Sequence, residues 1–265
     1  MMEKVILGRY LPADSIVHRM DPRAKLLFIF VFVLIVFLAN NVATYALLGA
    51  FTLFIVFSSN VKLRFLIAGL KPVILLILFT FFLHVFFTKE GEVLTQVGFL
   101  SIYEGGVIKG IFISLRFFLL ILVTSLLTLT TPPISVTDGI ESLFGPLKKI
   151  KVPVHELALM MSISLRFIPT LLDETDKIMK AQMARGADFT SGSIADRVKA
   201  VIPLLIPLFV SAFKRAEELA VAMEARGYKG GQGRTKYRVL AWHVRDTMAL
   251  LLLAVLAVVL FMLRS

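Results

Sequence analysis

Cysteine is absent from this chain of 265 residues. Without a thiol the chain forms no disulfide, no thiolate metal site and no cysteine nucleophile. It also lacks the G-x-x-x-x-G-K-[ST] pattern that holds nucleotide phosphates, so it does not bind ATP in that way. Its four histidines, at positions 18, 84, 155 and 243, fall in separate contexts and pair with no carboxylates in a recognisable metal or catalytic pattern. We expect no cofactor, no metal and no enzymatic activity of its own.

Polar residues are also scarce, and long apolar runs take their place. Hydrophobic residues make up 58% of the chain and the mean hydropathy is +0.86, well above the share of about 45–50% in soluble domains. The net charge of +11 could suggest nucleic acid. In a polytopic membrane protein, however, lysine and arginine mainly mark cytoplasmic loops and contact anionic lipid headgroups. We expect the chain to lie in a lipid bilayer and not to bind nucleic acid.

The apolar runs predict an all-α polytopic membrane protein with about five transmembrane helices. Asp21 followed by Pro22 is a favourable helix start before the first run. Asn40 and Asn41 separate the first two runs as a tight hairpin, and Pro132 and Pro133 stop the fourth. The predicted spans are approximately 26–39, 42–58, 66–87, 106–130 and 247–263.

Seventeen of the 29 basic residues lie between Lys148 and Arg245. The positive-inside bias predicts that this stretch is cytoplasmic, with the N-terminus also cytoplasmic and the C-terminus outside. The chain then divides into an N-terminal membrane domain with four spans (1–145), a cytoplasm-facing coupling module (146–245) and a C-terminal transmembrane helix (246–265).

Two segments of the basic stretch are first apolar and then amphipathic. The apolar parts are His155–Leu172 and Val201–Phe213. We expect each segment to form a helix that begins in the membrane and emerges from it, and together they give the two long amphipathic helices of the module. After the second apolar part, we expect Glu217 and Glu218 to form solvated ion pairs with Lys214 and Arg215 on one helix face.

A short motif ends both segments: Ala184-Arg185-Gly186 and Ala225-Arg226-Gly227. A basic residue in a last helical turn offsets the helix dipole, and glycine is the commonest helix stop, so one copy alone needs no further explanation. Attachment to lipid headgroups is a second ordinary reading. Two copies, each with a small residue beside the arginine, instead predict a pair of ends that dock onto a partner protein.

Small and flexible residues line the same helices. Alanines recur at four-residue spacing, which permits close helix crossing. Methionines on these helices serve either ordinary packing or an adaptable contact surface for partners. The predicted residues for helix crossing and partner contact are Ala212, Ala216, Ala220, Met179, Met183 and Met223.

One arginine, Arg116, lies near the middle of the fourth predicted span. A charge there costs about 2.5–3.5 kcal/mol on the insertion scale, so the side chain should face protein or water. A structural role, with the guanidinium bonded to carbonyls and hydroxyls, is one reading. A direct role in a transport cycle is the other.

These motifs together resemble the transmembrane T component of energy-coupling factor transporters, importers of the ATP-binding cassette type. The resemblance covers nearly the whole chain, and its motifs follow the family's order. They are Asp21-Pro22-Arg23-Ala24-Lys25, Leu165-Arg166-Phe167-Ile168-Pro169 with Glu174, the segments ending at Gly186 and Gly227, Pro203-Leu204-Leu205-Ile206-Pro207-Leu208-Phe209, and Arg234-Thr235-Lys236-Tyr237.

The resemblance implies a non-catalytic scaffold in a prokaryotic cell membrane. Such a subunit couples two cytoplasmic ATPases to a separate S component that captures a vitamin or metal, and Arg185 and Arg226 enter grooves on the two ATPases. A stand-alone secondary transporter is the alternative, but the ion-coupling groups it would need are not found apart from Arg116. An integral membrane enzyme would need a polar catalytic cluster, which is missing.

Overall fold

The computed structural model describes residues 10–97, 100–189, 193–230 and 239–264. The chain divides into two compact units, and each is described by itself. The larger unit comprises residues 7–143 and 240–265, and the smaller contains residues 144–239. The first nine residues and the motif Arg234-Thr235-Lys236-Tyr237, which is part of the family resemblance, lie outside the described residues.

The larger unit begins with the helical hairpin that the sequence predicted. Helix α1 spans Pro22–Val36, and Asp21 caps it by accepting a hydrogen bond from the Arg23 amide. Helix α2 spans Val42–Ser58 and starts with a capping box between Asn41 and Thr44. Both caps satisfy amides that a helix start leaves without partners, which is why the chain turns and restarts here.

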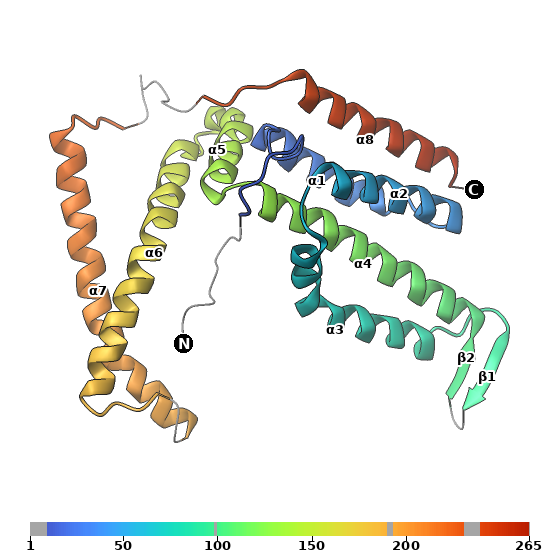
Figure 1. The fold of residues 1–265 in the computed structure, drawn as a ribbon, viewed down its shortest axis with the longest axis horizontal. Coiled ribbons are helices and arrows are strands. Elements are labelled where there is room, and N and C mark those ends of the chain that lie inside the picture. The colour runs from blue at the N-terminus through green and yellow to red at the C-terminus, as the bar shows by residue number, and fades with distance from the viewer. Residues whose placement is uncertain (1–9, 98–99, 190–192, 231–238, 265) are drawn as a thin grey trace. The chain divides into compact units, whose positions relative to one another are not determined.

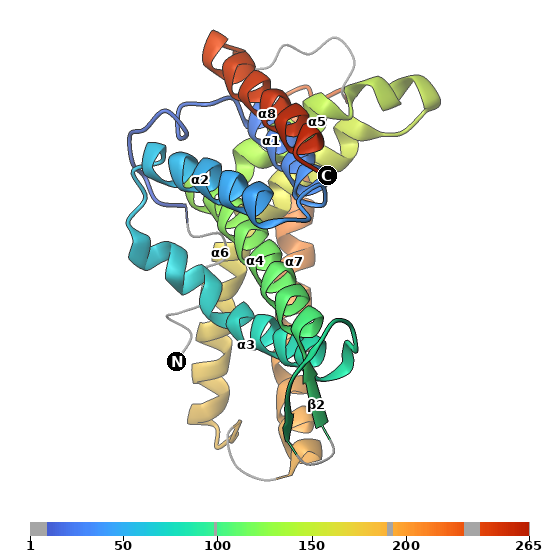
Figure 2. The same cartoon turned by 90° about the vertical axis from the view of Figure 1, so that its right-hand side faces the viewer.

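Helices α3 (Leu63–Phe87) and α4 (Glu104–Thr130) pack along one another. Figures 1 and 2 show them side by side, with the strands β1 (Val93–Val97) and β2 (Leu100–Tyr103) at the end where they join. The approach is close at Gly106, where a side-chain carbon would lie 2.9 Å from the His84 carbonyl oxygen. Only glycine fits here without a shift of backbone.

The antiparallel β-hairpin was not predicted. Strands β1 and β2 pair with an irregularity between Val93 and Thr95. A hairpin satisfies the backbone groups of a short exposed segment that is too brief to form a stable helix.

Helix α8 (Val244–Met262) returns to the larger unit and packs on α1. The main core is formed where α1, α2, α4 and α8 meet, around fully buried residues such as Phe32, Leu48 and Leu253. At the C-terminal end of α8, the Asn41 side-chain amide donates to the Leu263 carbonyl at 2.8 Å.

The predicted stop at the end of α4 is confirmed. Thr131 is extended, and a separate helix, α5 (Pro133–Leu143), follows. The proline at position 133 begins the new helix, where its missing amide proton costs nothing. Helix α5 packs against α1, with Pro22 and Leu26 next to Gly139.

The smaller unit contains a short 3-10 helix, η1 (Gly145–Ile150), and two long helices, α6 (Val154–Ala184) and α7 (Ile194–Ala225). Both long helices continue through internal prolines, and both end at the Ala-Arg-Gly motifs as predicted. Figure 1 shows them crossing.

The prediction of an all-α polytopic membrane protein is confirmed. Among the described residues, α3, α4, α6 and α8 are long and apolar enough to cross a membrane, and α2 is a shorter apolar helix. Helix α1 has 15 residues, fewer than the roughly 20 that a full crossing needs without thinning or tilt of the surroundings. Large apolar side chains along α3 are exposed, as expected for surfaces that face lipid or a membrane partner.

Candidate functional site

The two helices with arginine at their ends, α6 and α7, pack antiparallel. Ile163, near the start of α6, lines the same cavity as Met223, near the end of α7. Farther along α6, Glu174 contacts Ser211, which lies earlier in α7. The contacts therefore run in opposite directions along the two helices, and Figure 2 shows the same arrangement from the side.

The sequence did not indicate this antiparallel packing, and the prediction that both helices begin in the membrane and emerge from it stays a prediction. In an antiparallel pair the apolar start of α6 lies beside the arginine end of α7, so the two apolar halves occupy opposite ends of the pair. The amphipathic pattern decided only which face of each helix is apolar. It carried no information on the direction in which the two helices run past each other.

A carboxylate on α6 links the pair. Glu174 Oε1 accepts a hydrogen bond from the Ser211 hydroxyl at 2.5 Å. Its Oε2 accepts from two nitrogens of the Arg215 guanidinium, at 3.2 Å from Nε and 2.9 Å from Nη2. Two nitrogens of the planar arginine fork thus bond one carboxylate oxygen, whereas lysine has a single side-chain nitrogen. Arg215 therefore bonds across to α6 rather than to the glutamates that follow it on α7.

The link lies at the same distance from both tips. Glu174 precedes Arg185 by eleven residues, and Arg215 precedes Arg226 by eleven residues. Eleven residues are three helical turns, or about 16 Å at 1.5 Å per residue. Each helix thus extends an arm of equal length from the shared contact.

The first tip ends α6 with a double hydrogen-bonded turn. The amide of Gly186 donates to the Met183 carbonyl at 3.0 Å, and the amide of Ala187 donates to the Gln182 carbonyl at 3.0 Å. Gly186 has φ +90°, a conformation that costs side-chain-bearing residues about 1–2 kcal/mol. This Schellman ending leaves Arg185 at the cap position, exposed on the surface of the unit.

The second tip repeats this geometry at the end of α7. The amide of Gly227 donates to the Glu224 carbonyl at 2.8 Å, and the amide of Tyr228 donates to the Met223 carbonyl at 3.0 Å. Gly227 has φ +72°, and Arg226 is exposed. The two motifs are therefore alike in backbone conformation as well as in sequence.

Together the tips can present two guanidinium groups on rigid ends. A helix closed in this way holds its last turn firmly, because the final carbonyls are bonded rather than left to water. Ala184 and Ala225, next to each arginine, are exposed and add no bulk. Such an end suits a narrow groove that contains carboxylates or carbonyl oxygens.

The alanine stripe lies on the side of α7 that faces α6. Ala212, Ala216 and Ala220 line an open cavity of about 320 Å³, opposite Phe167 and Leu171 of α6. The close polar contact lies instead at Ser211. A tight crossing at the stripe therefore stays a prediction, because space remains between the helices here.

The three predicted contact methionines occupy different surroundings. Met223 lines the cavity between the helices and is half-buried. Met179 is half-buried, and Met183 is exposed next to the first tip. Packing accounts for Met223, whereas Met183 lies exposed beside the first tip and its partner contact stays a prediction.

Arg116 contacts the α1–α2 turn. Its Nη2 donates to the Ala39 carbonyl at 3.2 Å, and its guanidinium carbon lies 5.1 Å from the centre of the Phe37 ring. Arg116 lies in the middle of α4, but α1 is shorter than α4, so the Arg116 side chain reaches the end of α1. The Asn41 contact with α8 is close to this point. These contacts support the structural reading, in which the arginine binds a carbonyl that the end of α1 leaves free.

A buried carboxylate that sequence reasoning missed ties the chain's first and last helices together. Asp246 is 0% exposed. It accepts hydrogen bonds from the Asp21 amide at 2.9 Å and from the His243 amide at 2.8 Å. Arg23 pairs with Asp21 and lies 5.7 Å from the Trp242 ring centre. An acidic residue in a first helical turn was the only signal for it in the sequence.

Residues 13–237 match the family described as "Cobalt transport protein" (CbiQ). Over 265 residues the chain is 66% identical to the energy-coupling factor transporter transmembrane protein EcfT of Bacillus subtilis (strain 168), and the match covers 100% of both chains. It is 59% identical to the protein of that name from Listeria innocua over 265 residues, again with 100% of both covered. The protein of that name from Macrococcus caseolyticus is 57% identical over 266 residues, with 100% of both covered.

Proposed function

Because this chain belongs to the CbiQ family, with the energy-coupling factor transporter transmembrane proteins EcfT as its relatives, we propose that it couples ATP hydrolysis to movement in the membrane. The chain is a multi-pass membrane protein and a transporter component. Its proposed partners are two cytoplasmic ATPases and a membrane S component that captures a vitamin or other micronutrient. The ATPases supply the energy, and the S component supplies the specificity.

The observation that carries the proposal is the pair of identical helix ends on one linked pair of helices. Arg185 and Arg226 each cap a helix in the same Schellman geometry, and both are exposed. Antiparallel packing directs them to opposite ends of the pair. Two similar partner subunits can therefore each receive one tip without competing for the same space.

The Glu174–Arg215 contact gives the proposed coupling a mechanical basis. Because it lies eleven residues from each tip, a change in the separation of the two ATPases moves both arms about one shared point. A charge-assisted contact of each arginine with its ATPase would contribute roughly 1.5–3 kcal/mol, enough to keep the tips seated during a movement. The arms then pass the displacement to the part of the chain in the bilayer.

The proposed orientation follows from charge. With residues 148–245 on the cytoplasmic side, both arginine tips lie on the side where ATPases operate. The N-terminus is then cytoplasmic and the C-terminus outside. Exposed Met183, beside the first tip, is proposed to contact a partner, where a flexible thioether can pack against differing surfaces.

The test replaces each tip arginine with glutamate. Arg185→Glu and Arg226→Glu place a negative charge where a positive one is proposed to meet carboxylates or carbonyl oxygens. Each variant should lose uptake of the S component's substrate in proteoliposomes that contain the ATPases. The matched controls are Lys180→Glu on α6 and Lys214→Glu on α7, which change the charge equally on exposed parts of the same helices.

The outcome separates the proposal from its rival. Loss of uptake in the tip variants, with uptake retained in both lysine variants, supports docking through the tips. Unchanged uptake in both tip variants would contradict it. Substrate uptake by the chain alone, without any ATPase, would instead favour a stand-alone secondary transporter.

A further inference from the structure

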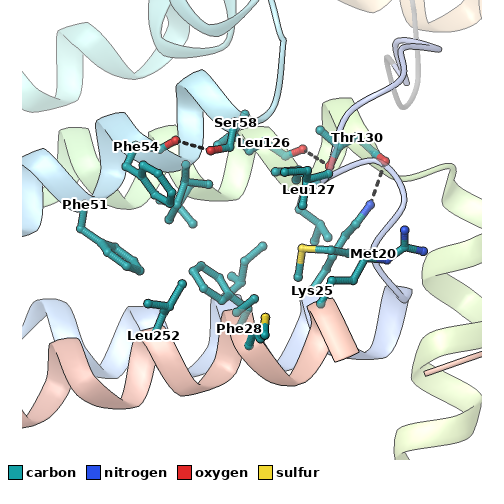
Figure 3. A pocket seen from close by; sticks show the side chains of 18 residues that line it. Met20, Lys25, Phe28, Phe51, Phe54, Ser58, Leu126, Leu127, Thr130 and Leu252 are labelled. Carbon is teal, nitrogen blue, oxygen red and sulfur yellow. Dashed lines mark hydrogen bonds between the residues drawn. The ribbon is translucent and has the colours of Figure 1, made fainter. Parts of the chain in front are cut away.

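A second feature of the larger unit is an apolar pocket of about 360 Å³ among α1, α2, α4 and α8. Figure 3 shows Phe28, Phe51 and Leu252 around its apolar part, with Lys25 directed toward Thr130 at one end. The pocket is near the lower limit of the 300–1,000 Å³ or so that ligand sites usually occupy. An α-helix, about 10 Å across with its side chains, needs a wider groove.

The pocket lies at one end of the helices that form it. Lys25 is near the start of α1, Ser58 is the last residue of α2, and Thr130 is the last residue of α4. Arg23 and Lys25, in the first turn of α1, and Arg245, in the first turn of α8, lie at this end. Large apolar side chains at its rim, including Phe54 at 61% and Leu252 at 52% exposed, leave it open to the surroundings.

Two cations lie at this end of the pocket. The Lys25 ammonium is buried and donates to the Thr130 carbonyl at 3.0 Å and the Thr131 hydroxyl at 2.9 Å. It also donates to the His18 carbonyl at 3.4 Å. All three acceptors are neutral, and no carboxylate among the described residues bonds to this ammonium. Arg245 also lines the pocket, and its Nε is buried without a hydrogen-bond acceptor among the described residues.

The nearby carboxylates are already engaged. Asp21 accepts from its own helix start and pairs with Arg23. Asp246 accepts from two backbone amides. They temper the local positive charge but do not fill the position in front of Arg245. An apolar slot with an unpaired guanidinium at its end matches an anionic amphiphile, whose tail enters the slot and whose headgroup meets the arginine.

We propose that this pocket binds one acyl chain of an anionic phospholipid, with the lipid phosphate on Arg245 and with Lys25 as a fixed positive charge behind it. The site is independent of the arginine tips and of the proposed coupling function. A lipid bound here would come from the leaflet on the side of the basic residues. It would hold α8, the last helix of the chain, against α1 and α2.

The experiment uses the full chain in phosphatidylcholine liposomes that contain a trace of phosphatidylglycerol with a photoactivatable group on its acyl tail. Irradiation and peptide mapping should place labels on pocket residues such as Phe54, Met248 and Leu252. Unlabelled phosphatidylglycerol should compete. Unlabelled phosphatidylcholine and inorganic phosphate at the same concentration should not, which separates a lipid headgroup from free phosphate.

Two pairs of variants test the two halves of the site. Arg245→Gln should lower labelling roughly tenfold, the loss expected for one charge-assisted contact, and Arg245→Lys should lower it less. Arg64→Gln is the matched control, because Arg64 is exposed and is also the second residue of its helix. Ala249→Phe should fill the pocket and abolish labelling there, whereas Ala254→Phe, on an exposed face of α8, should not.

Several results would overturn the proposal. Equal competition by phosphatidylcholine, or full labelling of Arg245→Gln, would show that the pocket does not recognise an anionic headgroup. Labels spread evenly over α3 and α8 would mean that no pocket is involved. In the complete transporter, cross-links from Phe54 or Leu252 to a partner protein in place of lipid would show that protein covers this surface.

Discussion

The two glycines after the tip arginines allow the role of tip geometry to be tested without touching any charge. Gly186 and Gly227 have positive φ angles, and a side-chain carbon at either would meet nothing within 4 Å. An alanine there is therefore strained by its backbone alone. The expected cost is about 1–2 kcal/mol at each position, which reduces the population of the closed helix end by about 5–30-fold.

Gly145 provides a matched control. It too has nothing within 4 Å, but its φ is not positive. Gly145→Ala should therefore leave the chain unchanged, while Gly186→Ala and Gly227→Ala open the helix ends. Asparagine, which tolerates the left-handed region better than alanine, should give an intermediate effect at both tips.

Two assays measure the effect. Hydrogen exchange of the Gly186, Ala187, Gly227 and Tyr228 amides should accelerate by about 5–30-fold in the alanine variants. The affinity of the purified chain for its ATPases should fall by a similar factor if docking needs the closed end. Faster exchange with unchanged ATPase affinity would refute the reasoning, because the arginines would then dock without the geometry that presents them.

Three further changes test other parts of the structure. Asp246→Ala leaves the buried Asp21 amide without its acceptor, at about 1–3 kcal/mol, and also frees the part-buried His243 amide. The melting temperature should therefore fall in a thermal unfolding assay. Asp246→Asn should recover part of it, and an unchanged temperature would count against the network. Glu174→Arg should separate α6 from α7, and adding Arg215→Glu should bring the two helices back together. The distance between spin labels on cysteines introduced into the two helices measures this. An unchanged distance would mean that the apolar contacts alone hold the pair. Arg116→Met should lower the melting temperature by removing the donor to Ala39, with uptake retained by the protein that remains folded; lost uptake at unchanged stability would favour a transport role.

Local signals predicted much of the fold because local chemistry decides it. Asp21 before Pro22 and Asn41 before α2 are caps, and they start helices where the sequence predicted. The glycines at 186 and 227 end α6 and α7 because these positions need positive φ. Each of these features is settled within a few residues of chain.

Features that depend on distant partners were not predictable in the same way. Glu174 bonds to residues 37 and 41 positions later, and Asp246 bonds to a residue 225 positions earlier. Periodicity shows which face of a helix is apolar, but it does not show which helix will pack on that face or in which direction. For this reason the antiparallel packing of α6 and α7 and the contacts of Arg116 emerged only from the structure.

The most direct test of the coupling account is the mass of the intact complex purified from membranes. The account predicts that the unaltered chain carries two ATPase subunits and an S component. The double variant with Arg185→Glu and Arg226→Glu should keep the S component but carry no ATPase. A double variant that still carries both ATPases would contradict the central claim that the two arginine tips dock them.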